Sequence, residues 1–394
     1  MPRHVFVPTW YRQETNDRGI AVWRLCEAFD RDARLAAVYS DQTLVTALDP
    51  DTAEQVGEHA WTGVPTSSST LPSLMAHMLE DLSVEDGHRV LEIGTGSGYN
   101  AALPSARLGD SLVYSVDIDP DLVESARSRL TTAGFQPHLA VGDGQSGYPA
   151  HSVFDRIIAT CSVPGIPAAW IEQTRPGGII LADLSLGMEG GLVRLAVDEE
   201  RRALGHFTTA TGRFMAARGA ARGYSRCERA PYAPLAEERA SKVIAADIRA
   251  YYPFRLVAAF HLPGVELVYH VDDGTGDMEL QLQRRDGAWA RAPLTGERVA
   301  TVTYGGAVDL WERTEAAWLW WDDHGRPAQD RFGYVREADG REYAWHIPDG
   351  RRCPSAPDGD ASDFVVSIGQ RHADAMACRC PILTTTSSEQ LRES

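Results

Sequence analysis

The chain has little basic charge and hardly any lysine. Its 394 residues include 38 Lys and Arg against 55 Asp and Glu, a formal net charge of -17 at pH 7, and Lys242 is the single lysine. A chain this acidic repels the phosphate backbone of nucleic acid, and it offers no electrostatic attraction for an acidic substrate. We therefore expect no nucleic-acid partner.

Long hydrophobic runs and clustered cysteines are also absent. No apolar stretch approaches the ~18 residues that a membrane-spanning helix needs, and no secretory signal is seen, so we expect a cytoplasmic protein without a membrane partner. The cysteines are too scattered for a disulfide framework, which fits a reducing compartment. Cys378 and Cys380 with His372 give only three ligands at an unfavourable spacing, so no metal site is expected. The cysteines are Cys26, Cys161, Cys227, Cys353, Cys378 and Cys380.

The most informative stretch that is present is VLEIGTGSGY, residues 90–99. An apolar strand ends in the acid Glu92, and glycines follow at alternate positions, at 94, 96 and 98. A dinucleotide fingerprint has the spacing GxGxxG, whereas this spacing makes a tight bend that a bulkier, phosphate-free group can approach closely. It favours S-adenosylmethionine over a nicotinamide cofactor, although a glycine loop alone is also typical of a plain turn.

Acidic residues follow the next two apolar strands. LVYSV (112–116) leads into Asp117, and an acid at the carboxyl end of this second strand can accept hydrogen bonds from both ribose hydroxyls. HLAV (138–141) leads into a Gly-Asp-Gly sequence at 142–144. Its Asp143 either meets the adenine amino group or is only a turn residue.

Further elements complete the pattern of an α/β sheet. Asp119 caps a helix with Pro120 at its first position, and Gly134 ends it. Continuous apolar runs at 154–160 and 175–183 suit a parallel sheet that is buried on both faces.

In this order over residues 90–183, the motifs resemble a class I S-adenosylmethionine-dependent methyltransferase. The front end resembles protein-L-isoaspartate (D-aspartate) O-methyltransferases through MPRHVFVPTWY, VYSDQTL (38–44) and SSSTLPSLMAHMLEDL (67–82), and RFMAARGA (213–220) resembles the end of their catalytic domain. The resemblance implies a Rossmann-like, doubly wound α/β sheet over 83–220. It also implies an amino-terminal helical, substrate-side segment over 1–82, S-adenosyl-L-methionine as cofactor, and a peptide or protein substrate that carries aspartate or isoaspartate.

Methyl transfer to a carboxylate needs few reactive groups. The reaction is an in-line displacement at a sulfonium carbon, and the acceptor carboxylate, with a pKa near ~4, is already ionised at neutral pH. The protein must supply alignment, exclusion of water and hydrogen-bond donors. The hydroxyl run before Pro72 suits this role, together with the free amides of the helix it opens, or it only caps that helix.

The site residues follow from these motifs. We assign Thr70 and Ser69 to catalysis, and Ser67 and Ser68 to substrate binding. The family that the chain resembles usually has serine where this chain has Thr70, so its substrate pocket differs there. The expected cofactor-binding residues are Glu92, Gly94, Thr95, Gly96, Gly98, Tyr99, Asp117, Ile118, Gly142, Asp143 and Gly144.

The carboxyl half is expected to form a further domain. Residues 221–240 read as a linker, and 241–350 as an α+β accessory domain for peptide recognition. In it we expect a helix over 241–252 that ends before Pro253, tryptophans that pack a core or bind a peptide, and a hairpin around Asp339. Residues 351–394 read as a mostly disordered tail with a short strand at FVVSI.

This extension sets the functional alternatives. With this extension, the chain resembles carboxyl-extended relatives of the isoaspartate methyltransferases. Those relatives are encoded with ribosomal peptide natural products such as lanthipeptides and graspetides. That resemblance implies methylation of a peptide aspartate, whose ester collapses to a succinimide (aspartimide). General isoaspartate repair and methylation of a small-molecule carboxylate remain alternatives, as does a non-catalytic peptide-binding protein that keeps the cofactor fold.

Overall fold

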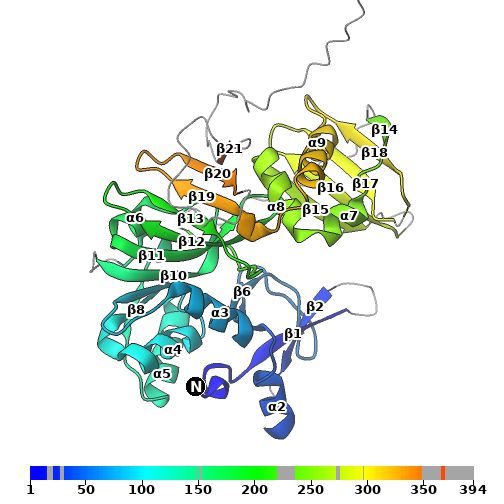
Figure 1. The fold of residues 1–394 in the computed structure, drawn as a ribbon. Coiled ribbons are helices and arrows are strands. Elements are labelled where there is room, and N and C mark those ends of the chain that lie inside the picture. Colours follow the sequence, from blue (N-terminus) through cyan, green and yellow to red (C-terminus); the bar gives the residue numbers. More distant parts are fainter. Residues whose placement is uncertain are drawn as a thin grey trace, which may run out of the picture.

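The structure is a computed structural model, and three β-sheets organise the residues it describes (Figure 1). These are residues 1–15, 21–26, 31–148, 150, 153–219, 236–271, 276–295, 297–347 and 365–368.

A ten-stranded sheet forms the centre of the molecule. Five parallel strands make up one half; across the sheet they are β9 (His138–Val141), β8 (Val113–Asp117), β7 (Val90–Ile93), β10 (Phe154–Val163) and β11 (Thr174–Ser185). Every residue of β7 and β8 is buried, as their continuous apolar runs predict. The doubly wound α/β class is thus confirmed.

Helices cover both faces of this half. They are α3 (Pro72–Leu82), α4 (Tyr99–Leu108), α5 (Pro120–Thr132) and α6 (Ala168–Glu172), with short 3-10 turns η1 (Asp110–Leu112) and η2 (Gly144–Ser146). Leu74, Met78 and Leu82 of α3 pack on Ile158 and Leu181 of the sheet. Asp119 caps α5 by accepting from the amides of Asp121 and Leu122, as expected.

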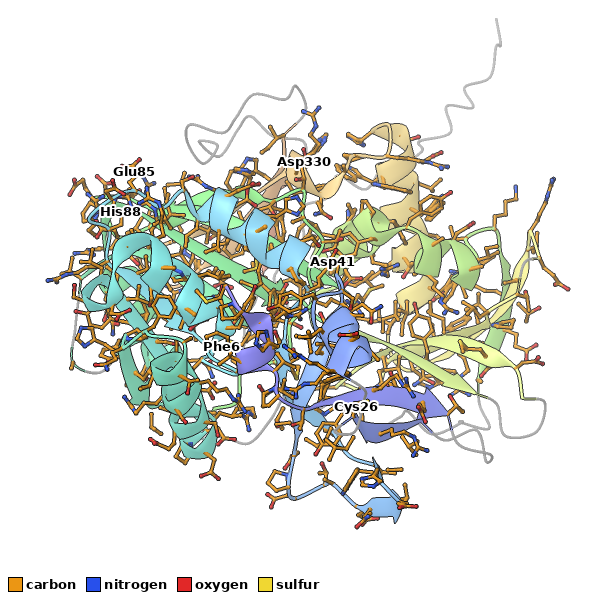
Figure 2. All side chains as sticks on the ribbon, turned by 90° about the horizontal axis from the view of Figure 1, so that it is seen from below. Phe6, Cys26, Asp41, Glu85, His88 and Asp330 are labelled. Atoms are coloured by element: carbon orange, nitrogen blue, oxygen red, sulfur yellow. The ribbon has the colours of Figure 1, made fainter. Side chains whose placement is uncertain are left out.

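The amino-terminal segment is a six-stranded sheet and not the helical segment that we expected. Its strands are short and only partly buried, so they lack the continuous apolar runs that mark the central strands. Phe6 and Cys26, labelled in Figure 2, belong to its buried core. The elements are α1 (Arg3–Phe6), β1 (Trp10–Thr15), β2 (Ala21–Cys26), α2 (Arg31–Val38), β3 (Leu44–Leu48), β4 (Gln55–Gly57), β5 (Ala60–Trp61) and β6 (Pro65–Ser69).

A five-stranded antiparallel sheet with three helices forms the accessory domain, at the upper right of Figure 1. Ser241 ends a strand instead of capping a helix, and a new helix begins at Tyr252 because proline is tolerated in a first turn. The helix expected over 241–252 is therefore wrong in both bounds. The elements are β14 (Glu237–Ser241), α7 (Ala245–Ala250), α8 (Tyr252–His261), β15 (Val265–Val271), β16 (Met278–Arg284), β17 (Trp289–Pro293), β18 (Ala300–Gly305) and α9 (Leu310–Asp323).

The tryptophans of α9 serve mainly as core residues. Trp311 and Trp321 are buried, and Trp318 packs edge-on against Phe254 with ring centroids 4.7 Å apart. Trp320 stacks on His324 with centroids 4.1 Å apart.

The chain returns to the central sheet after α9. β12 (Gly190–Val197) and β13 (Ala203–Phe207) extend the sheet antiparallel from β11, and β19 (Phe332–Arg336) pairs with β13, followed by β20 (Glu342–His346) and β21 (Val365–Ile368). The short turn η3 (Gln329–Arg331) precedes β19.

This pairing corrects the predicted domain bounds. The hairpin around Asp339 belongs to the central sheet, so the accessory domain is an insertion between β13 and β19 and does not extend to residue 350. Strand β14 begins inside the predicted 221–240 linker, and β21 forms the strand expected at FVVSI. The rest of the linker and tail, including His372, Cys378 and Cys380, lies outside the described residues.

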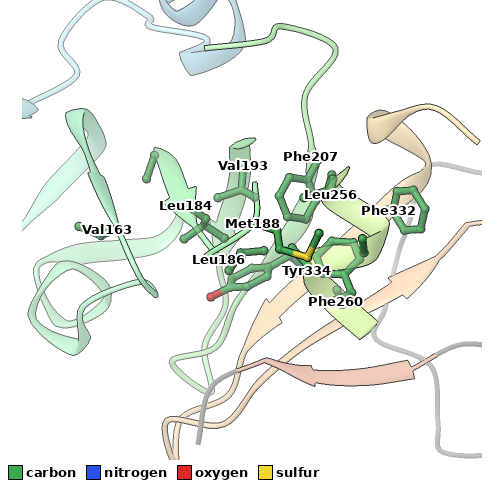
Figure 3. Close-up of a cluster of buried hydrophobic side chains, with 14 of the residues drawn as sticks. Val163, Leu184, Leu186, Met188, Val193, Phe207, Leu256, Phe260, Phe332 and Tyr334 are labelled. Atoms are coloured by element: carbon green, nitrogen blue, oxygen red, sulfur yellow. The ribbon is translucent and has the colours of Figure 1, made fainter. Parts of the chain in front are cut away.

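One hydrophobic core joins the accessory domain to the central sheet. In Figure 3, Met188 from the turn between β11 and β12 lies beside Phe260 of α8 and Tyr334 of β19. Leu256 of α8 and Phe207 of β13 belong to the same cluster. The insertion is therefore packed onto the sheet and not held by a linker alone.

Candidate functional site

A cavity of about 370 Å³ opens at the carboxyl ends of the parallel strands. Ligands of open α/β sheets bind at this edge. The wall comes from segments far apart in the sequence: residues 65–71, 92–97, 116–118, 143–145, 160–161 and 211–218, with several neighbours.

The glycine loop needs its glycines. Gly94, Gly96 and Gly98 all have positive φ, at 96°, 50° and 83°. A Cβ at Gly94 would lie 2.8 Å from Oγ1 of Thr160, and one at Gly98 3.1 Å from Cβ of Ala126. Because L side chains rarely adopt this backbone, these positions favour glycine, and Gly94 and Gly96 also line the cavity.

Asp117 lies at the end of β8, as expected, and lines the cavity. Its side chain accepts hydrogen bonds from the amides of Gly96 (2.9 Å) and Asp119 (3.2 Å), and Nη2 of Arg218 lies 3.9 Å away. The carboxylate is thus fixed by backbone donors at the edge of the glycine loop. An oriented acceptor beside closely approaching backbone fits the ribose of S-adenosylmethionine.

Glu92 is fully buried, and its oxygens already have partners. Nδ2 of Asn100 and Oγ of Ser115 donate to it, each at 2.6 Å, and Oγ1 of Thr95 lies 2.7 Å from the same Ser115 hydroxyl. Burial raises the pKa of Glu92 to about 7. Glu92 therefore supports the glycine loop through Ser115 and Thr95, and both Glu92 and Thr95 line the cavity.

The Gly-Asp-Gly turn contributes two of its three residues. Asp143 accepts from the amide of Gln145 (2.9 Å), so the turn interpretation is confirmed, yet Asp143 also lines the cavity. A Cβ at Gly144 would lie 2.5 Å from Cγ2 of Ile93, so packing requires glycine there. Gly142 does not line the cavity; its amide donates to the carbonyl of Asp117 (2.9 Å), and its assignment as a cofactor ligand stays a prediction.

Ser67, Ser68 and Ser69 lie on strand β6, Thr70 follows it, and none of them caps α3, so the expectation of a helix cap is wrong. Leu71 is the N-cap, without a side-chain hydrogen bond, and the amide of Ser73 donates to Asp41 (2.9 Å). Pairing with β3 fixes the run as a strand. All four predicted hydroxyl residues, Ser67, Ser68, Ser69 and Thr70, line the cavity.

This strand lies against the glycine loop. Oγ of Ser67 is 3.4 Å from the position that a Cβ at Gly96 would occupy. Oγ of Ser67 accepts from Thr46 (2.9 Å), and that of Ser69 accepts from Nε of Arg3 (3.2 Å). Most of the residues expected to bind substrate and cofactor are thus brought into one cavity, Tyr99 and Ile118 included, whereas Gly98 and Gly142 do not line it.

Sequence reasoning missed Arg3. Its side chain is 1% exposed. Besides the Ser69 hydroxyl, it donates to the carbonyls of Val38, Ser40, Gln42, Ser69 and Thr70. Its one visible signal was a basic side chain in the otherwise mostly apolar stretch PRHVFVP.

It also missed the wall formed by residues 211–218, although RFMAARGA was noted as a motif. The amide of Phe214 donates to Asp183 (3.1 Å), and Ser162 pairs with Ala216. Burial raises the pKa of Asp183 to about 7. Arg213 and Arg218 place two guanidinium groups at this wall.

Other chemistries find little support in the described residues. Cys161 lines the cavity, but burial raises its pKa to about 12, so its thiol stays protonated and is a poor nucleophile. Nowhere in the described ranges do three or more His, Cys, Asp or Glu side chains gather as a metal site. No described helix has the length and apolar character that crossing a membrane requires.

Comparison with known proteins finds similarity over part of the chain. Residues 13–205 match the protein-L-isoaspartate (D-aspartate) O-methyltransferase family. A protein-L-isoaspartate O-methyltransferase of Thermococcus onnurineus is 44% identical over 112 residues, 28% of this chain and 50% of that protein. One of Methanosarcina mazei is 41% identical over 112 residues, 28% of this chain and 46% of that protein.

The chain thus spans about half the length of the curated O-methyltransferases it matches. A solved protein-L-isoaspartate O-methyltransferase aligns over 87% of this chain and 91% of its own, with 20% identity and a TM-score of 0.47.

Proposed function

We propose that the chain is an S-adenosylmethionine-dependent O-methyltransferase that esterifies the side-chain carboxylate of an aspartyl or isoaspartyl residue in a peptide. One observation carries the proposal: the glycine loop with Asp117 and the hydroxyl strand β6 line the same cavity, with Ser67 against Gly96. The family match over residues 13–205 supports it.

The chain's own groups account for the steps that the protein must perform. Asp117 accepts the ribose hydroxyls, and the glycine loop lets the cofactor approach the backbone. S-adenosylmethionine supplies the methyl group on its sulfonium. Ser69 and Thr70 hold the acceptor carboxylate; because the Ser69 hydroxyl accepts from Arg3, its own hydrogen remains to donate, and the cationic partner strengthens that donation. No general base is required, since the acceptor is ionised at neutral pH.

The finer assignment concerns the peptide. We favour a ribosomally made peptide natural product, such as a lanthipeptide or graspetide, in which the aspartyl ester collapses to a succinimide. The resemblance of the extended chain and the insertion of a whole domain beside the cavity support this assignment. General isoaspartate repair fits the family match equally well.

The test is mass spectrometry of the full chain with S-adenosylmethionine and a pair of synthetic peptides, one with aspartate and one with isoaspartate at the same position. We expect gain of a methyl group followed by loss of methanol. Methylation of the isoaspartyl peptide alone indicates repair, whereas methylation of only a cyclised natural-product precursor indicates biosynthesis.

Calorimetry with S-adenosylhomocysteine tests the cofactor site separately. Binding that is lost in Asp117→Ala supports the assignment. Absence of binding to the unmodified chain, or full binding to the variant, contradicts the methyltransferase proposal. Either result favours the alternative of a non-catalytic peptide-binding protein that keeps the cofactor fold.

A further inference from the structure

Glu189 joins the cavity wall to the accessory domain. It lies in the turn between β11 and β12 and is 4% exposed. Its Oε1 accepts from Nε (2.9 Å) and Nη2 (2.5 Å) of Arg213, which lines the cavity. Its Oε2 accepts from Nε of Arg255 (2.7 Å), which belongs to α8 of the inserted domain.

The accessory domain holds this turn firmly. Oη of Tyr252 donates to the carbonyl of Gly190 (2.6 Å). A Cβ at Gly187 would lie 2.3 Å from the carbonyl oxygen of Val265, so the turn lies directly on strand β15. Met188 packs in the apolar cluster that α8 shares with the central sheet (Figure 3). The position of Glu189, and with it that of Arg213, therefore depends on the inserted domain.

The charges around Glu189 do not cancel. One carboxylate serves two guanidinium groups, which leaves one positive charge in excess. A further acid, Asp183, interacts with Arg213, but burial raises its pKa to about 7, so it is partly protonated at neutral pH. Arg218, the other cation of the wall, lies beside Asp117 and Asp119. Although the whole chain carries -17, its cavity is thus locally positive at Arg213.

Arg213 faces solvent at the cavity mouth. Its side chain is 72% exposed, and within the described part of the chain its Nη1 group has no hydrogen-bond partner. The reacting carboxylate must lie deeper, beside the buried hydroxyls of Ser67 and Ser69, because methyl transfer requires exclusion of water. An anion that reaches Arg213 is therefore a second one, on the peptide next to the methylated residue.

We propose that Arg213 binds an acidic side chain of the substrate peptide close to the acceptor residue, and that Arg255 and Glu189 are positioning residues through which the inserted domain presents Arg213. The inference rests on the proposed function and adds the substrate class, a peptide with an acidic neighbour beside the acceptor. A shared carboxylate suits this task, since it fixes two donors of Arg213 and leaves Nη1 for the ligand.

The experiment compares methylation rates of matched synthetic isoaspartyl peptides. Each peptide carries glutamate at one of the two positions on either side of the isoaspartate, and its partner carries glutamine there. For at least one position we expect kcat/KM of the glutamate peptide to exceed that of its partner about three- to tenfold, mainly through KM, and the excess to shrink with added salt.

Variants identify the residues responsible. Arg213→Gln is expected to bring the glutamate-to-glutamine ratio to about one. Arg255→Gln is expected to lower the glutamate-to-glutamine ratio although Arg213 is still present, because Glu189 then neutralises Arg213 alone. Arg255→Lys is expected to restore the ratio. Arg127→Gln, at an exposed arginine of α5 that does not line the cavity, keeps the full ratio.

Three kinds of result would contradict the inference or a part of it. Equal methylation of glutamate and glutamine peptides by the unmodified chain overturns this inference alone, as does a preference that survives Arg213→Gln. Absence of methylation from every peptide overturns the proposed function, and this inference with it. A ratio that Arg255→Gln leaves unchanged removes the role of the inserted domain.

Discussion

At the scale of single residues, Glu92 links the stability of the glycine loop to pH. Its pKa is raised from 4.5 to about 7 by burial, so the folded chain keeps a proton that the unfolded chain loses. Its contribution to stability is full below the unfolded pKa and falls as pH rises through the folded one. Between about pH 4.5 and 7 the loss amounts to about 3 kcal/mol at most.

We therefore expect Glu92→Gln to remove part of the pH dependence of the free energy of unfolding. Denaturant unfolding at about pH 5 and about pH 8 measures it, as the difference between the unmodified chain and the variant. The exposed Glu58 provides the control, since Glu58→Gln leaves the dependence unchanged. A difference that stays constant with pH contradicts this role of Glu92.

Arg3 acts on the substrate side of the cavity. Lysine cannot reproduce a planar guanidinium that reaches five backbone carbonyls and a hydroxyl, so Arg3→Lys leaves several buried acceptors unpaired. We expect a loss of about 2–4 kcal/mol in the free energy of unfolding and a fall of about tenfold or more in kcat.

Binding of S-adenosylhomocysteine separates this effect from general damage. The hydrogen bonds of Arg3 hold β6, and its guanidinium carbon lies 5.9 Å from the centre of the Tyr99 ring beside the glycine loop. Because lysine keeps a cation near that ring, calorimetry of Arg3→Lys is expected to give an affinity close to that of the unmodified chain. Arg12→Lys, at an exposed arginine bound to Glu14, changes neither quantity. Equal loss of cofactor binding and turnover in Arg3→Lys would count against a substrate-side role.

At the scale of elements, the glycine loop combines two constraints that substitution can separate. Gly94→Ala meets both an unfavourable φ of 96° and a close approach to Thr160, and the residue lines the cavity. Gly109 also has positive φ, at 88°, but nothing lies within 4 Å of its would-be Cβ. We expect Gly94→Ala to abolish measurable cofactor binding, while Gly109→Ala costs only about 1–2 kcal/mol of stability and keeps binding intact. Calorimetry and thermal unfolding of both variants provide the comparison.

The same elements show what the sequence could predict. Buried parallel strands such as β7 and β8 carry continuous apolar runs, and the acid that follows β8 is a local signal. Strand β6 could not be distinguished from a helix cap, because serine and threonine are the preferred caps and only pairing with β3 makes the run a strand. Arg3 was missed for a related reason: its acceptors are carbonyls, which every sequence has.

At the scale of the whole molecule, the inserted domain and the central sheet share one hydrophobic core. The pairing of β13 with β19 joins residues more than a hundred positions apart, and such long-range pairing leaves no local trace in the sequence. This is why the boundary near 350 was wrong. The hypothesis that a complete catalytic domain ends near residue 220 is therefore tested first by whether the truncated chain folds, before its activity is measured.

We expect a chain truncated after residue 219 to fail to fold. It loses β19 and β20 from the sheet edge, and Phe207 loses its contacts with Phe260 and Tyr334. Unpaired β13 is then an exposed edge beside uncovered apolar surface, which favours aggregation. Soluble yield and thermal unfolding of the truncated chain measure the effect, and supplying residues 236–347 as a separate chain should recover part of both. A truncated chain that unfolds cooperatively and binds S-adenosylhomocysteine would mean that the insertion, despite its shared core and the Glu189 contacts, is an independent module.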